Sequence, residues 1–73
     1  MKFDGATVRA RREQMAMRPE QLAAGIDRCV TSVLQYERGA IDPPASIVAR
    51  LAEVLHVDPG ELFTDAPALG SAA

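Results

Sequence analysis

Apolar residues recur along the chain at steps of three and four positions, the spacing that places side chains on one face of an α-helix. The pattern is clearest near the middle of the second half, where it comprises Ile47, Val48, Leu51, Val54 and Leu55. A sparser stripe near the N-terminus comprises Phe3, Val8, Met15 and Met17, while Arg9, Arg11 and Glu13 are expected to face outward. This stripe predicts a first helix that Asp4 caps and that runs to about Met15, since a carboxylate favours the positive start of a helix.

Local start and stop signals divide the following segment into two short helices. Pro19 suits the first position of a second helix, because the N–H that proline lacks has no partner there. This helix is expected to end at residue 25 or 26. A third helix spans residues 30–38, and Gly39 stops it.

Proline-containing signals mark two more helices. Asp42-Pro43-Pro44 predicts the start of the fourth helix, and Asp58-Pro59-Gly60-Glu61 predicts the start of a fifth. The first 64 residues then form one domain, and residues 65–73, rich in alanine, proline, glycine and serine, are expected to be a disordered tail. The facing stripes of the second, third and fourth helices predict that six residues are buried together: Leu22, Ala23, Ile26, Val33, Leu51 and Leu55.

The composition limits the class of protein. At 73 residues the chain is near the lower limit for an independent core, and with three aromatic residues that core must be largely aliphatic, which favours an all-α fold. No apolar run is long enough to span a membrane, so the chain is expected to be cytoplasmic and without a membrane partner. A single cysteine cannot form an internal disulfide, which agrees with a reducing compartment.

Charge is unevenly distributed, although the net charge is only −2. Through Gly39, seven basic residues outnumber five acidic ones, whereas Arg50 alone opposes five acidic residues after that point. A mildly basic part that reads DNA and an acidic part that packs the core are compatible with phosphate binding, although the charge does not require it.

The segment from Leu22 to Gly39 has the pattern of two helices joined by a tight turn. Apolar or small residues stand where one helix is buried on the other, and Ala23 lacks the bulk that would keep the helices apart; the set is Leu22, Ala23, Ile26, Val33 and Tyr36. This segment, which ends in Glu-Arg-Gly, resembles the helix-turn-helix of phage repressors and Cro proteins, the XRE family. The resemblance extends from about Asp4 to Phe63.

The resemblance implies a compact five-helix bundle of the lambda-repressor-like DNA-binding type, with the second and third helices as the helix-turn-helix. It further implies a sequence-specific transcriptional regulator that binds double-stranded DNA as a homodimer on a two-fold operator. Asp27 and His56 replace glycines that are usual in the family, and both residue types tolerate a left-handed backbone. Cys29 replaces the serine or threonine that often caps the third helix.

The family's DNA contacts map onto the third helix and its surroundings. The first, second and sixth residues of that helix reach base edges in the family, which implies base reading by Val30, Thr31 and Gln35. Gln35 can pair with adenine, whereas Val30 offers only apolar contact, as to a thymine methyl. Arg18 and Arg38 are implied to hold phosphates. The alternative is that these residues are simply the exposed positions of a packed helix.

Two further expectations concern contacts within and between copies. Arg12 and Glu37 match family positions that form an ion pair between the first and third helices, a structural role. Val57, Leu62 and Phe63 are apolar residues near the chain end. They either form the dimer interface or complete the core of a single copy.

Other chemistry finds little support in the sequence. Cys29 is a small residue in place of serine or, alternatively, a reactive thiol at a helix start. His56 has no second ligand at metal spacing, so no metal site is expected. The chain has no nucleophile–base pair, phosphate-binding glycine loop or paired carboxylates, and we therefore expect neither enzyme activity nor a cofactor.

A different function is compatible with the same fold. Several features suit a protein-interaction module with little DNA affinity. They are the acidic net charge, Pro19, the absence of a basic residue from the loop over residues 40–42, and the exposed Val30 and Leu34. Such a module binds another regulator. A related alternative is an antitoxin or phage-derived partner whose acidic fourth and fifth helices dock a second protein.

Overall fold

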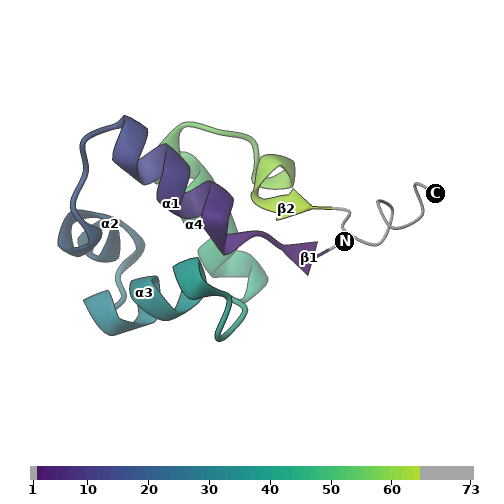
Figure 1. Ribbon diagram of the computed structural model, residues 1–73, viewed down its shortest axis with the longest axis horizontal. Helices are drawn as coiled ribbons and strands as arrows, with labels where there is room; N and C mark the ends of the chain where they lie inside the picture. Colours follow the sequence, from purple (N-terminus) through teal and green to yellow (C-terminus); the bar gives the residue numbers. More distant parts are fainter. Residues whose placement is uncertain (1, 65–73) are drawn as a thin grey trace.

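The computed structural model describes residues 2–64, and the expected tail over residues 65–73 lies outside the described residues. Four α-helices account for most of it, and two short strands and one 3₁₀ turn complete it (Figure 1). In chain order the elements are β1 (Lys2–Phe3), α1 (Gly5–Gln14), α2 (Pro19–Ile26), α3 (Val30–Arg38), α4 (Ala45–Leu55), η1 (Pro59–Leu62) and β2 (Phe63–Thr64).

The helices begin where the sequence signals predict. Asp4 caps α1, since one carboxylate oxygen accepts the N–H of Ala6 at 3.1 Å and the other accepts the Thr7 hydroxyl at 2.7 Å. Pro19 is the first residue of α2, as predicted. The side chain of Gln21 accepts the N–H of Arg18 at 2.7 Å, which satisfies a donor at the start of that helix.

The prediction of a fifth α-helix is wrong. Residues after Asp58 form only a single 3₁₀ turn, η1, although Glu61 accepts the N–H of Asp58 at 3.2 Å as a helix-start signal requires. The turn cannot continue because the next two residues are extended and pair with the N-terminus. The described chain therefore has four α-helices.

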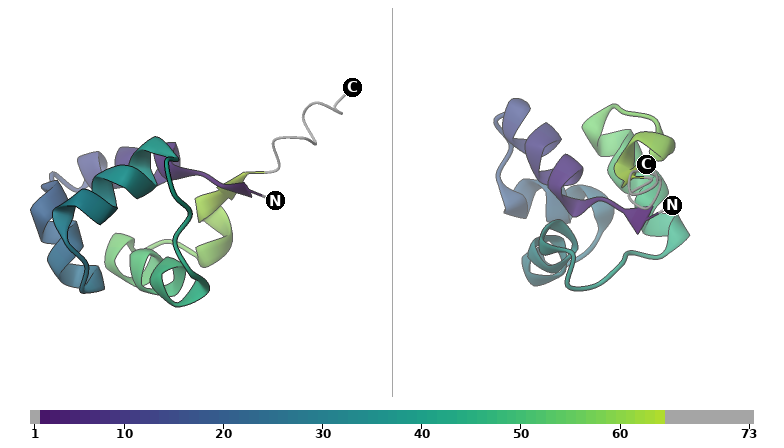
Figure 2. Two further views of the ribbon diagram at one scale, coloured as in Figure 1. Left: turned by 90° about the horizontal axis from the view of Figure 1, so that it is seen from below. Right: turned by 45° about the vertical axis from the view of Figure 1, so that its right-hand side comes forward.

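A two-stranded antiparallel sheet joins the ends of the described chain, so the fold is mostly helical rather than all-α. Lys2 pairs with Thr64 and Phe3 with Phe63, and the two phenylalanine rings meet edge to face with centroids 6.0 Å apart. Phe3 therefore lies in β1, a strand that the sequence did not predict. Both views in Figure 2 show these strands side by side.

A left-handed residue ends each of α2, α3 and α4, and a fourth lies in the turn after α1. Asp27 and His56 both have φ of 58°, as predicted for residues that replace a usual glycine, and Gly39 has φ of 77°. Ala16, in the turn after α1, has φ of 54°, which nothing in the sequence indicated. A left-handed alanine costs roughly 1–2 kcal/mol, so the contacts around this turn must offset that cost.

The core lies between the helices and under η1. All six residues predicted to be buried together are buried, and they belong to one apolar cluster with Phe3, Val8, Tyr36, Ile47, Val48, Ala52 and Leu62. Ala23 of α2, a helix that packs on both α3 and α4, is only 4% exposed. Leu62 is fully buried in the single copy and cannot form a dimer interface, whereas Val57 and Phe63 are half-buried against the same cluster.

Two contacts fix α1 on its neighbours. Gly5 lies so close to the end of α3 that a Cβ there would be 2.0 Å from the carbonyl oxygen of Tyr36, which requires glycine. Arg11 is half-buried rather than outward-facing, because its Nε donates to the carbonyl of Leu55 at 2.9 Å. Within residues 2–64, no helix combines the length and apolar character that crossing a membrane requires.

Candidate nucleic-acid interface

α3 has one face in the core and one face in solvent. Val33 and Tyr36 are buried, and the exposed side carries Thr31, Leu34 and Arg38 at steps of three and four residues. Positions at this spacing share one side of a helix, so the three exposed side chains form a continuous stripe. We call Thr31, Leu34 and Arg38 the outer stripe of α3.

A buried ion pair orients α3 on α1. Arg12 Nε lies 2.7 Å from one oxygen of Glu37, and Nη2 lies 3.2 Å from the other oxygen, so the contact is bidentate. Arg12 Nη1 also donates to the carbonyl of Met17 at 2.8 Å, in the turn before α2. The two side chains are only 9% and 4% exposed.

The ion pair with Glu37 explains how the charged Arg12 can be buried. The hydrogen bond to Glu37 raises the pKa of Arg12, and burial opposes this effect without cancelling it. One guanidinium thereby connects α1, the turn before α2, and α3. The structure thus brings together the two residues that the sequence assigned to a structural ion pair.

The proposed base-reading residues differ in exposure. Thr31 is exposed at the second position of α3, whereas Val30 and Gln35 are half-buried. The side chain of Val30 packs partly against the core. Base reading by these residues remains a prediction, and the exposure makes Thr31 the most accessible of the three.

The two arginines predicted to hold phosphates lie at opposite ends of the helix pair. Arg18 is exposed at the start of α2, and Arg38 is exposed in the last turn of α3. Both are therefore free to face a polyanion, although the phosphate roles remain predictions. Asp42, in the loop between α3 and α4, is exposed as well.

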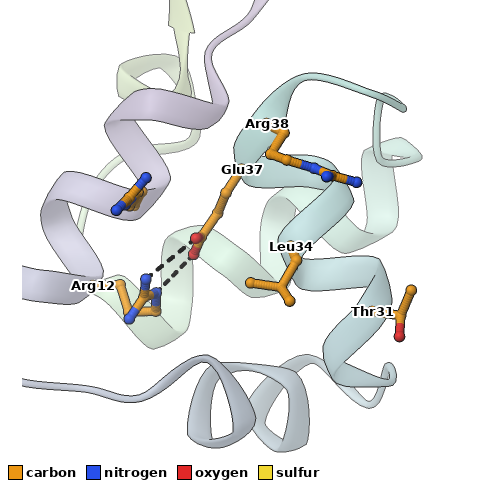
Figure 3. A pocket seen from close by; sticks show the side chains of 6 residues that line it. Arg12, Thr31, Leu34, Glu37 and Arg38 are labelled. Atoms are coloured by element: carbon orange, nitrogen blue, oxygen red, sulfur yellow. Dashed lines mark hydrogen bonds and ion pairs between the residues drawn. The ribbon is translucent and has the colours of Figure 1, made fainter.

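A hollow of about 430 Å³ separates α1 from the outer stripe of α3 (Figure 3). We call it the α1–α3 hollow, and its lining residues are Arg9, Arg12, Thr31, Leu34, Glu37 and Arg38. Arg9 is not among the DNA-binding residues predicted from the sequence. The signal was available, because Arg9 precedes Arg12 by one helical turn and must lie on the same side of α1.

Cys29 occupies the cap position of α3 without capping it. The thiol is exposed and makes no hydrogen bond to the free N–H groups of the helix, and its sulfur lies 3.5 Å from the Ser32 hydroxyl. That contact and the nearby Ser32 N–H lower the pKa of the Cys29 thiol. Both roles proposed from the sequence, small residue and reactive thiol, are compatible with this geometry.

A group of carboxylates lies around the end of α4 and η1. A second, shallower hollow of about 470 Å³ is lined by Ala52, Glu53, His56, Val57, Asp58 and Glu61. Within residues 2–64, no three histidine, cysteine or carboxylate side chains are arranged to hold a metal ion. The hollow beside η1 is thus lined by three carboxylates, whereas the α1–α3 hollow is lined by three arginines and one carboxylate.

Solved structures share this fold. The P22 c2 repressor in complex with synthetic operator 9T is similar with a TM-score of 0.81 and 23% identity, and the match covers 88% of this chain and 97% of that chain. The DNA-binding domain of the P22 c2 repressor in solution gives a TM-score of 0.77 and 26% identity, covering 80% of this chain and 76% of that chain.

Two other proteins show how widely the fold is used. The clp gene regulator ClgR from C. glutamicum has a TM-score of 0.74 and 22% identity, over 94% of this chain and 87% of that chain. Fe(II) HppE in complex with substrate has a TM-score of 0.74 and 26% identity over 82% of this chain, but only 35% of that chain. Since the fold also forms part of such a protein, function must be argued from the site.

Sequence comparison identifies the family. A search among curated proteins found no match. The family model for the helix-turn-helix domain matches residues 5–63, which include all four α-helices and η1. The chain therefore belongs to the helix-turn-helix domain family, whose fold is that of DNA-binding transcriptional regulators.

Proposed function

We propose that this protein binds double-stranded DNA sequence-specifically, with α3 in the major groove, and regulates transcription from the bound site. The observation that carries this proposal is the family match over residues 5–63 together with the exposed outer stripe of α3. The similar P22 c2 repressor was solved with a synthetic operator, which supports the same kind of ligand here.

The outer surface of α2 and α3 suggests which residues read bases and which bind phosphates. Thr31 and Gln35 read base edges, since an amide or hydroxyl can hydrogen-bond there and a methyl group can contact thymine. Val30 adds apolar contact. Arg18 and Arg38 hold phosphates at the two ends, which positions α3 without contributing to sequence preference.

A two-fold dimer follows from the shortage of cations. Phosphate contacts dominate the affinity of DNA-binding proteins, and the whole chain has only eight lysines and arginines, of which Arg12 is buried in an ion pair. Two copies on a two-fold operator double the phosphate contacts. The dimer uses a surface other than Leu62, which the core of each copy occupies.

Selection of binding sites from random duplex DNA at low salt tests the proposal directly. We expect a preferred sequence with two-fold symmetry, and affinity that falls steeply as salt approaches physiological strength. Sedimentation of the protein with the selected duplex should give two copies per site. Failure to bind any duplex at low salt would show that the proposal is wrong.

Two substitutions separate base reading from phosphate binding. Gln35→Ala should relax the base preference at one position of each half-site, a loss of about 1–3 kcal/mol of discrimination. Arg38→Ala should weaken selected and random duplexes equally and reduce the salt slope by about one unit per subunit. Arg50→Ala, on the exposed side of α4, is the matched control and should leave both quantities unchanged.

The acidic hollow favours a second candidate, a module that docks another protein. It combines the carboxylates of Glu53, Asp58 and Glu61 with the half-buried Val57, a surface suited to a basic segment with an apolar residue. If no duplex is bound while the protein retrieves one specific partner from its own cells, and Glu53→Gln abolishes that retrieval, this candidate replaces the first.

A further inference from the structure

We propose that Arg9 of α1 and Arg38 of α3 hold one phosphate of the DNA backbone between them in the α1–α3 hollow, with Leu34 against the adjoining deoxyribose. The inference rests on the proposed function and deepens it. It assigns a DNA contact to α1, outside the helix-turn-helix unit formed by α2 and α3.

The charges that line the hollow favour an anion. Arg12 and Glu37 form a bidentate pair in which both carboxylate oxygens are engaged, so they largely cancel each other. The remaining charged residues of the lining are Arg9 and Arg38, both exposed. A ligand that enters the hollow therefore meets two positive charges and no unpaired negative one.

Both arginines are available for such a ligand. Among the residues that the structure describes, Arg9 pairs only with Glu13, at 3.1 Å, and the two side chains are 65% and 55% exposed. An exposed pair of this kind contributes little, about 0.3–0.5 kcal/mol for neighbours one helical turn apart, so Arg9 can exchange it for a phosphate. Among residues 2–64, no side chain forms a hydrogen bond or ion pair with Arg38.

The apolar residue in the lining selects between anions. Leu34 is 43% exposed and lines the same hollow as the two arginines, where a polar side chain would suit a free phosphate better. A nucleotide backbone presents a charged phosphate beside a largely apolar sugar, which matches this arrangement. Thr31 lies seven residues before Arg38 and is thus about 10 Å away along α3. That end of the outer stripe therefore remains available to contact bases.

The test measures binding of the full chain to its selected duplex as a function of salt. Affinity falls by some factor when salt rises from about 50 mM to 200 mM. For Arg9→Gln this factor should be about threefold smaller per subunit than for the wild type, because one phosphate contact is lost. Arg50→Gln removes the same charge from an exposed position on α4 and should have no such effect. Glu13→Gln frees Arg9 and should strengthen binding, while Glu53→Gln should not.

A scan with neutral methylphosphonates along the duplex identifies the phosphate. At one position of each half-site, neutralisation should weaken the wild type most, weaken Arg9→Gln and Arg38→Gln less because each retains one of the two contacts, and leave the double variant nearly unaffected. If the two variants respond at different positions, or if Arg9→Gln behaves like Arg50→Gln, the shared contact is wrong while the proposed function stands. A wild type that binds no duplex would overturn both. If Arg9→Gln impairs only the retrieval of a protein partner, the hollow is a protein-docking site instead.

Discussion

α3 and α4 are helices of similar length that are held in the fold by different forces. α4, with 11 residues, buries Ile47, Val48, Leu51, Ala52 and Leu55, whereas α3, with 9 residues, buries only Val33 and Tyr36. α3 compensates with an ion pair, because Glu37 binds Arg12 of α1 in a nearly solvent-free site. The outer stripe of α3 thereby stays open.

The comparison separates stability from recognition. Burial of a leucine side chain contributes about 1.5–3 kcal/mol, so α4 supplies much of the hydrophobic free energy of the domain. α3 needs only enough anchoring to keep one orientation, and a bidentate pair provides direction that apolar contacts do not. Substitutions in α4 should therefore change stability, and substitutions on the outer stripe should change binding.

The largest expected effect is that of truncating a buried leucine in α4. Leu51→Ala should lower the free energy of unfolding by about 3–5 kcal/mol, since Leu51 is fully buried and its loss leaves a cavity. Urea unfolding followed by circular dichroism measures this change. Leu34→Ala, the same substitution on the exposed side of α3, should cost about 1 kcal/mol or less. Similar losses for the two variants would remove the contrast between the helices.

The ion pair should rank second. Glu37→Gln should destabilise the domain by about 3 kcal/mol, because it leaves the buried Arg12 guanidinium without its charged partner. Glu13→Gln alters an exposed pair and should stay within about 0.5 kcal/mol of the wild type. Thermal unfolding of the two variants checks the order. Equal melting temperatures would mean that α3 is anchored by Val33 and Tyr36 alone.

The crossing of α2 and α3 should tolerate little added volume. Ala23→Val should cost roughly 1–3 kcal/mol, since Ala23 is 4% exposed where the two helices pack. Ala24→Val, the next residue of α2, points to solvent and is the matched control. Denaturant midpoints of the two variants give the comparison. A destabilisation that is no larger for Ala23→Val than for Ala24→Val would show that the crossing is loosely packed.

The smallest effect concerns the start of α3. Cys29→Ser should stabilise the domain by about 0.5–1 kcal/mol, because a serine hydroxyl can accept a free helix N–H that the Cys29 thiol does not bind. Cys29→Ala, which also removes the thiol, should give no gain. A calorimetric scan resolves the difference, and equal stability of the serine and alanine variants would indicate that this cap contributes nothing.

Much of the fold was predictable from local signals. Asp4 as a cap and Pro19 at a helix start each depend on a few neighbouring residues, whereas the left-handed Asp27 and His56 were expected from the glycines that the resembled family has there. The six residues predicted to be buried together depend on helical periodicity, which is also local. These features need no knowledge of which helix meets which.

Errors arose where distant segments compete with local preference. The start signal at Asp58 predicted a helix, but pairing of Phe63 with Phe3 makes the following residues extended. The same pairing makes Phe3 part of a strand, which the apolar pattern near the N-terminus did not predict. Leu62, left open between core and dimer interface, lies in the core because η1 turns it inward.

What the sequence by itself determined is the set of four α-helices, their boundaries to within one or two residues, the apolar faces and the family resemblance. Only the tertiary structure decided the approach of α1 to α3 that requires Gly5, the left-handed Ala16, and the hollow that places Arg9 and Arg38 around one space. The physical reason is the distance along the chain over which each kind of interaction acts. Caps, turns and periodicity act over a few residues, whereas close packing brings together groups that no local pattern relates.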